Sequence, residues 1–213
     1  MGNFVHHLSG GIAAGALCGA VSYYNLHTPA TDAAAFAIIS CVGSLLPDID
    51  SPNSKPNDLA FGLAGAITPI FVLQSIGLAR LGASNVILTA LVVYVAVKYL
   101  ARWLMQQFSV HRGMFHSIPM AIIWGALVYH AFRLSPQLIK NAAAASALVG
   151  FMTHLIIDEM FSFIDFDGIR IAPKKSFGTA LKFYSSSLLA TTATYAVLGL
   201  MLYACMRDMR LFR

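Results

Sequence analysis

Long apolar stretches separated by short polar turns make up most of the chain. A helix that crosses the hydrocarbon core of a bilayer needs about 20 apolar residues. Seven stretches approach or reach that length: Leu8–Tyr24, Ala33–Leu46, Leu59–Ala79, Asn85–Met105, Ile118–Phe132, Ala142–Phe161 and Ser185–Met206. This pattern predicts an all-α, polytopic membrane bundle of about six to seven transmembrane helices. The second and fifth stretches are short, so a tilted, partly buried or re-entrant segment is also compatible with either.

Glycines recur at intervals of four in the first stretch, at Gly11, Gly15 and Gly19. Small residues at this spacing let two helices approach closely in lipid. Between stretches, the polar segment from Asp165 to Lys182 is too hydrophilic to span and is expected at a membrane interface.

The composition agrees with a membrane protein. Of the 213 residues, 58% are hydrophobic and only 11% are charged, and mean hydropathy is +0.70. A soluble domain carries about 25% charged residues. The spanning helices use nearly the whole length, so residues 1–213 are predicted to form a single integral membrane domain. The net charge of +5 is then attributed to contacts with lipid headgroups, and no nucleic-acid partner is expected.

Four polar clusters fall on one side of the membrane when the helices are followed alternately across it. They precede the first stretch, follow the second and fourth, and lie on the sixth: His6-His7, Asp48 with Asp50, His111 with His116, and His154 with Asp158. Ionisable groups at membrane segments are costly and usually mark a function.

His154 and Asp158 are four residues apart, so both side chains lie on one helical face, one turn apart. An imidazole and a carboxylate in this arrangement can bind one metal ion, or form a hydrogen-bonded pair that locks two helices together. Glu159 points about 100° away from Asp158 and is a weaker candidate.

The two loop clusters have less regular spacing. Asp48 and Asp50 lie two apart in a proline-bounded turn, where they either point at one centre or remain solvated. His111 and His116 are separated by five residues across a glycine, so they converge only in an irregular turn. Between them, Arg112 is a planar donor suited to phosphate or carboxylate.

Histidines combined with carboxylates suit zinc best, with manganese or iron as alternatives. More ligands than one tetrahedral ion requires would suit a two-metal site, and such a site could activate a water and clamp an in-line phosphoryl displacement. A metal-ion or proton-coupled transporter could use the same ligands, and a structural lock between helices needs no metal at all. The chain has neither a Gly-x-Ser-x-Gly nucleophile motif nor a phosphate-binding P-loop.

In this order the clusters resemble the YdjM-like family of membrane-bound, metal-dependent hydrolases, some of them under LexA control. The resemblance covers about residues 1–165. It is carried by the amino-terminal histidine, the run Leu45–Pro52, the run His111–Ser117 and the segment Gly150–Asp158. That family is remotely similar to zinc phospholipase C and P1 nuclease, helical proteins whose His and Asp ligands hold metal ions that hydrolyse phosphodiesters.

The resemblance implies a metal-dependent hydrolase, a phosphoric ester hydrolase, in the bacterial inner (plasma) membrane, with a phospholipase C-like metal core. It favours His7 over His6 as the amino-terminal ligand. One to three divalent ions, zinc first, would be held by His7, Asp48, Asp50, His111, His116, His154 and Asp158. The catalytic base would be whichever of Asp48 and Asp50 does not bind metal. A lipid or lipid-linked phosphoester would be bound by Arg112, Lys174 and Lys175. The segment Glu159–Ser162 replaces a short Thr-Pro turn of the family, which leaves the substrate open.

Overall fold

The computed structural model describes residues 3–50, 82–101, 103, 114–165, 170–171 and 181–209, together with residues 57–58, 61–62, 65–66, 68–69 and 72–73. The chain divides into two compact units, one formed by residues 1–47 with 112–213 and the other by residues 48–111. Among the described residues, the first unit contains the helices α1 (Phe4–Tyr24), α2 (Ala30–Gly43), α6 (Ile118–Ala131), α7 (Gln137–Phe163) and α8 (Leu188–Asp208). A short antiparallel pair, β1 (Ile164–Asp165) and β2 (Arg170–Ile171), follows α7.

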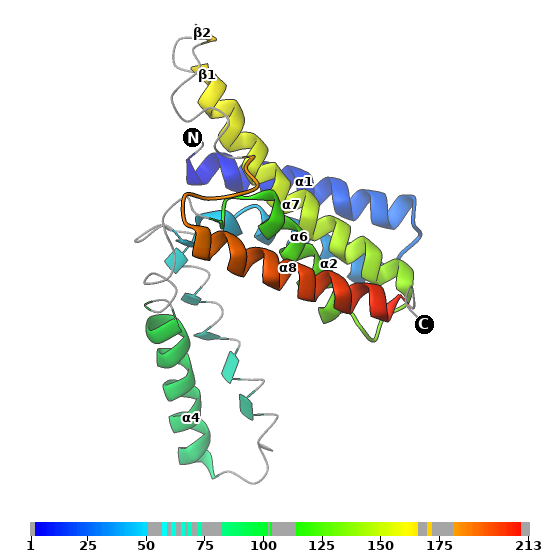
Figure 1. Ribbon diagram of the computed structural model, residues 1–213. Coiled ribbons are helices and arrows are strands. Elements are labelled where there is room, and N and C mark those ends of the chain that lie inside the picture. The colour runs from blue at the N-terminus through cyan, green and yellow to red at the C-terminus, as the bar shows by residue number, and fades with distance from the viewer. Residues whose placement is uncertain are drawn as a thin grey trace. The chain divides into compact units, whose positions relative to one another are not determined.

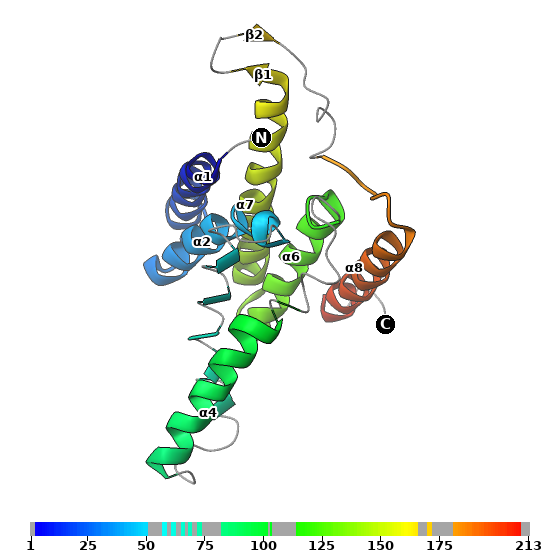
Figure 2. The ribbon, with the colours of Figure 1, turned by 90° about the vertical axis from the view of Figure 1, so that its left-hand side faces the viewer.

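Helix α7 is the central element of the first unit. It packs against α1, α2 and α6, and α6 in turn packs against α8. In Figure 2, α1 and α2 lie on one side of α7, and α6 and α8 lie on the other. Buried Phe151 and Leu155 of α7 pack against Ala121 of α6, so the same helix that bears the predicted His-Asp pair also supplies much of the core.

Close helix contacts depend on glycine, as the spacing in the first stretch predicts. A Cβ atom on Gly15 of α1 would lie 2.5 Å from the carbonyl oxygen of Ala37 in α2. A Cβ atom on Gly150 of α7 would overlap the carbonyl oxygen of Ser40 in α2. The backbones of α1 and α7 therefore approach α2 more closely than any larger residue at these positions would allow.

Four described helices are long and apolar enough to cross a membrane: Phe4–Tyr24, Ala83–Leu100, Gln137–Phe163 and Leu188–Asp208. Helices α2 and α6 are apolar but shorter, as predicted for the second and fifth stretches. These findings confirm a helical membrane protein. Most of the third stretch, Leu59–Ala79, lies outside the described residues, and the total of six to seven spans stays a prediction.

The sixth predicted helix, α7 (Figure 1), begins earlier than its apolar pattern indicates. Its first residue is Gln137 rather than Ala142. The polar side chains of this first turn are satisfied within the protein. Lys140 is only 5% exposed, bonds to Asp208 of α8, and lies 4.5 Å from the ring centroid of Tyr129. Lys140 precedes the apolar stretch, so its sequence position is typical of a loop. It is accommodated inside the helix because its ammonium group is paired with a carboxylate.

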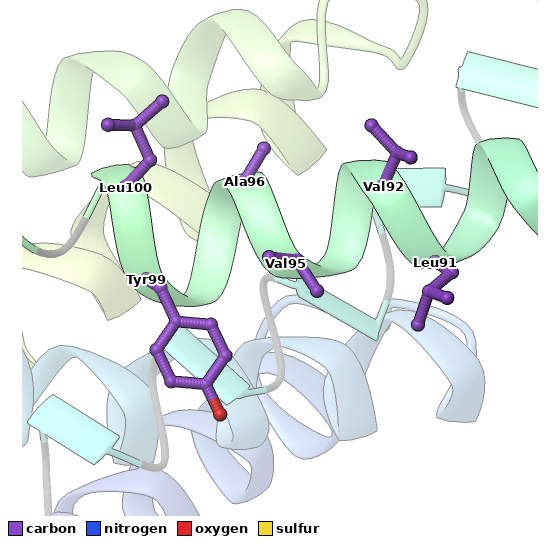
Figure 3. A pocket seen from close by; sticks show the side chains of 6 residues that line it. All are labelled: Leu91, Val92, Val95, Ala96, Tyr99 and Leu100. Atoms are coloured by element: carbon purple, nitrogen blue, oxygen red, sulfur yellow. The ribbon is translucent and has the colours of Figure 1, made fainter.

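In the second unit, α4 (Ala83–Val95) continues directly into a π-helical segment, η3 (Ala96–Ala101). The sequence predicts one regular helix across Asn85–Met105, so this change of winding is a finding of the structure. An open apolar groove of about 450 Å³ follows α4 and η3 and is lined by Leu91, Val92, Val95, Ala96, Tyr99 and Leu100 (Figure 3). Its lining suits contact with lipid tails.

Candidate metal centre

His154 and Asp158 share one face of α7, as their spacing predicts. Both side chains are essentially inaccessible to solvent, with exposed fractions of 0% and 1%. His154 Nε2 lies 3.6 Å from Asp158 Oδ2. This pair forms the base of a cluster to which two further histidines are added.

His7 reaches the cluster from α1. Its Nε2 lies 3.3 Å from Asp158 Oδ1, and its ring stacks on that of His154 with centroids 3.7 Å apart. The neighbouring His6 has a different role, because its Nδ1 accepts a hydrogen bond from Asn3 and completes a capping box at the start of α1. The structure therefore brings His7, and not His6, to the pair on α7.

His116 approaches from the segment just before α6. Its Nε2 lies 4.0 Å from Asp158 Oδ2, and its ring meets that of His154 edge-on at 5.4 Å. The next residue, Ser117, caps α6 by accepting a hydrogen bond from Met120. The backbone of this segment pairs with Lys182, since the Ile118 amide donates to its carbonyl oxygen at 3.1 Å. His116 is thus held between a helix start and a backbone bridge.

The orientation of His154 is set by a backbone group. Its Nδ1 lies 2.7 Å from the carbonyl oxygen of Ser44, which follows the last residue of α2. A carbonyl oxygen only accepts hydrogen bonds, so Nδ1 carries the proton of this bond. In the neutral ring, Nε2 then presents its lone pair toward Asp158.

The separations around Asp158 fit a shared cation. The three nitrogen–oxygen distances of 3.3, 3.6 and 4.0 Å exceed the usual range of about 2.7–3.2 Å for N–H···O hydrogen bonds. Two ligands of one tetrahedral zinc ion, each about 2.0–2.1 Å from it, lie about 3.3 Å apart. The ligand atoms of His7, His154 and Asp158 all lie within 4.8 Å of one another.

The chemistry of the donors agrees with this geometry. Imidazole nitrogens and one carboxylate form a set suited to zinc, iron or manganese. The residues present therefore fit a divalent transition metal.

The remaining predicted site residues belong to the second unit or lie outside the described residues. Asp48 and Asp50 belong to the 3₁₀ segment η1 (Leu46–Asp50), but both fall in the second unit, and the side chain of Asp50 lies outside the described residues. Four more predicted residues lie outside the described part of the chain altogether: His111, Arg112, Lys174 and Lys175. Their roles stay predictions.

Ser44 is the residue that sequence reasoning missed. It acts on His154 through its backbone carbonyl, and any residue type supplies a carbonyl, so no sequence motif marks the position. Two other described histidines, His130 and His27, are not part of the cluster. His130 contacts Cys205 Sγ at 3.4 Å, and His27 sits in the turn after α1 with φ of 52°.

A model of the family described as YdjM inner membrane protein matches residues 1–211. No curated protein and no solved structure matches the chain. The match includes every residue of the cluster. None of these comparisons bears on the remote similarity to zinc phospholipase C and P1 nuclease, which stays a prediction.

Proposed function

Because the chain belongs to the YdjM inner membrane protein family, we propose that it is a membrane-embedded, metal-dependent hydrolase. The observation that carries the proposal is the buried cluster of His7, His116, His154 and Asp158, which three separate parts of the chain contribute. Ionisable side chains buried inside a membrane protein are costly, and they mark a function by default.

Each residue has a defined part in the proposal. His7 and His154 would hold the ion through the nitrogens that face Asp158, whose two oxygens lie toward different rings. His116 would add a third imidazole. A divalent ion bound in this set would supply an activated water and neutralise the charge that develops on a phosphoryl group. Burial of the four side chains keeps bulk water away, which strengthens these electrostatic interactions.

A phosphoester in a lipid or lipid-linked substrate is the class that the position of the cluster supports best. His7 lies in the first turn of α1, and Asp158 lies in the last two turns of the 27-residue α7. Both helices are long enough to span the bilayer, so their ends lie near the level of the headgroups. The same proposal includes a phospholipase C-like core of six to seven helices. Phosphate would be bound by Arg112, Lys174 and Lys175. Asp48, Asp50 and His111 would bind metal, and one of the two aspartates would act as the base.

The first test is elemental analysis of the purified protein, followed by assays on vesicles that contain defined phospholipids and lipid-linked phosphates. We expect at least one equivalent of transition metal per chain, zinc first, and phosphoester hydrolysis that stops when a chelator removes the metal. His154→Ala should lose the metal, whereas His130→Ala, a histidine at the opposite end of α6, should retain it.

Two outcomes would contradict the proposal. Protein without stoichiometric metal, or equal metal content in both variants, would remove the metal centre. Metal uptake into sealed vesicles with no hydrolysis of any phosphoester would instead favour a transporter.

A further inference from the structure

Ser44 contacts two residues of the cluster at once, through different groups. Its hydroxyl donates to the carbonyl oxygen of His7 at 3.1 Å, and shares its proton with the carbonyl oxygen of Cys41 at 2.7 Å. Its own carbonyl oxygen accepts the Nδ1–H of His154 at 2.7 Å. Ser44 is completely buried, so water does not compete for either contact.

A serine hydroxyl bonded to a carbonyl of its own helix is common and carries no information about a site. Ser146 of α7 is such a case, since among the described residues its buried hydroxyl donates only to the carbonyl oxygen of Ala142 one turn earlier. Ser44 differs because its second acceptor belongs to another helix, 37 residues away in the chain. That bond links the end of α2 to the first turns of α1, where His7 lies.

The surrounding backbone makes this link possible. Gly11, one turn after His7, lies directly against Ser44, and a Cβ atom at Gly11 would overlap the Ser44 hydroxyl oxygen. The absence of a side chain at Gly11 lets α1 approach α2 at the level of the cluster. As a result, a single residue fixes the main chain of His7 and the ring of His154.

We propose that Ser44 is a positioning residue of the metal centre. Its carbonyl holds His154 in the tautomer that carries hydrogen on Nδ1 and leaves Nε2 to face Asp158, and its hydroxyl fixes the position of His7 opposite that nitrogen. The inference rests on the proposed metal site and adds to it a residue outside the ligand set. Partners of this kind, which orient a ligand histidine through its other nitrogen, typically change metal affinity 10–100-fold when lost.

The first experiment compares Ser44→Ala with Ser146→Ala, two substitutions that each remove one buried hydroxyl. Zinc affinity is measured by competition with a chromophoric chelator, and the cobalt-loaded proteins are compared by visible absorption. We expect zinc affinity to fall about 2–10-fold in Ser44→Ala, as for the loss of one intramolecular hydrogen bond, and the cobalt spectrum to change, because His7 is no longer held in place. Ser146→Ala should match the wild-type protein in both measurements.

Equal zinc affinity and equal cobalt spectra in the two variants would overturn the role of the hydroxyl. This result is distinct from failure of the metal site itself, in which the wild-type protein would bind no zinc at all.

The second experiment does not depend on a Ser44 variant that folds. Nitrogen-15 NMR of the histidine rings in the metal-free wild-type protein, with the His154 signals assigned by their loss in His154→Gln, reports which ring nitrogen carries hydrogen. We expect a protonated Nδ1 and an unprotonated Nε2 on His154 at a pH where the ring is neutral. The opposite tautomer would overturn the role of the Ser44 carbonyl, whatever the zinc measurements show.

Discussion

Asp158 places a carboxylate among three imidazole rings in the interior of a membrane protein. A carboxylate withdrawn from water is stabilised only when positive charge or hydrogen-bond donors surround it. His7, His116 and His154 lie within 4.0 Å of its oxygens, and the tautomer set by Ser44 directs a lone pair of His154 toward it. Two electron-rich atoms that face each other in this way require a cation between them, either a proton or a metal ion.

The role of the Asp158 carboxylate is tested by replacing it with a neutral amide of the same size. In Asp158→Asn, zinc affinity should fall more than about 100-fold, because the one carboxylate of the cluster is gone. This loss exceeds the roughly 10–100-fold change typical when a residue that only orients a ligand is removed. The matched control is Glu159→Gln, which removes the next carboxylate along α7 but faces about 100° away. Zinc titration of both variants checks the prediction, and comparable losses in the two would contradict it.

At the scale of elements, the cluster depends on how closely α7 approaches α2. The ring of His154 meets the end of α2 at Ser44, and one turn earlier Gly150 meets the carbonyl of Ser40. These contacts lie on the same face of α7, because positions 150 and 154 are one turn apart. The packing of α7 against α2 and the position of the His154 ring therefore depend on the same interface.

Gly150→Ala should disturb both properties. The added methyl group would overlap backbone atoms of Ser40, which have no rotamer to move into, so overpacking is expected to cost about 1–3 kcal/mol of stability. Zinc affinity should fall as well, since α7 and α2 must separate. Gly199→Ala in α8 is the control, because a Cβ atom there has open space and alanine is favoured in helices by about 0.5–1 kcal/mol. Thermal unfolding in detergent and zinc titration measure the two effects, and a stable, zinc-binding Gly150→Ala protein would contradict the argument.

A second set of polar side chains joins α6, α7 and α8 at the ends of these helices that lie away from the cluster. Lys140 bonds to Asp208, and the hydroxyl of Tyr129 donates to the same carboxylate at 2.8 Å. Substituting either Lys140→Met or Asp208→Asn should lower the thermal unfolding temperature, because each leaves the other partner without its counter-charge. The double variant should lose less than the sum of the two single losses. Strictly additive losses would show that the pair is not coupled, and zinc affinity should remain unchanged in all three proteins.

Particular residues show why some features could be predicted from the sequence and others could not. Apolar length alone identifies α1, α4, α7 and α8, and the spacing of four identifies the pair on α7, because both signals are local. The start of α7 is not predictable in this way, since Lys140 is tolerated only through Asp208, 68 residues later. The contact of Ser44 is equally hidden, because it joins positions 110 residues apart through a backbone atom.

For the whole first unit, α7 links two buried polar centres that have different compositions. Lys140 lies near its start and Asp158 near its end, 18 residues later. At about 1.5 Å per residue, this separation is about 27 Å, close to the roughly 30 Å thickness of a hydrocarbon core. Both centres are therefore placed where a spanning α7 would leave the hydrocarbon, one at each membrane face. Polar groups at these depths avoid the centre of the bilayer, where they are most costly.

This arrangement predicts the membrane sidedness of two exposed residues. Leu134, in the turn between α6 and α7, is 93% exposed at the Lys140 end, and Tyr184, two residues after Lys182, is 74% exposed at the end that bears His116. Single cysteines, Leu134→Cys and Tyr184→Cys, are introduced after Cys18, Cys41 and Cys205 are replaced by serine. A maleimide that does not cross membranes should label one variant in intact spheroplasts and the other only in inverted vesicles. Labelling of both from the same side would mean that α7 does not span the membrane, and would remove the argument that places the cluster at the level of the headgroups.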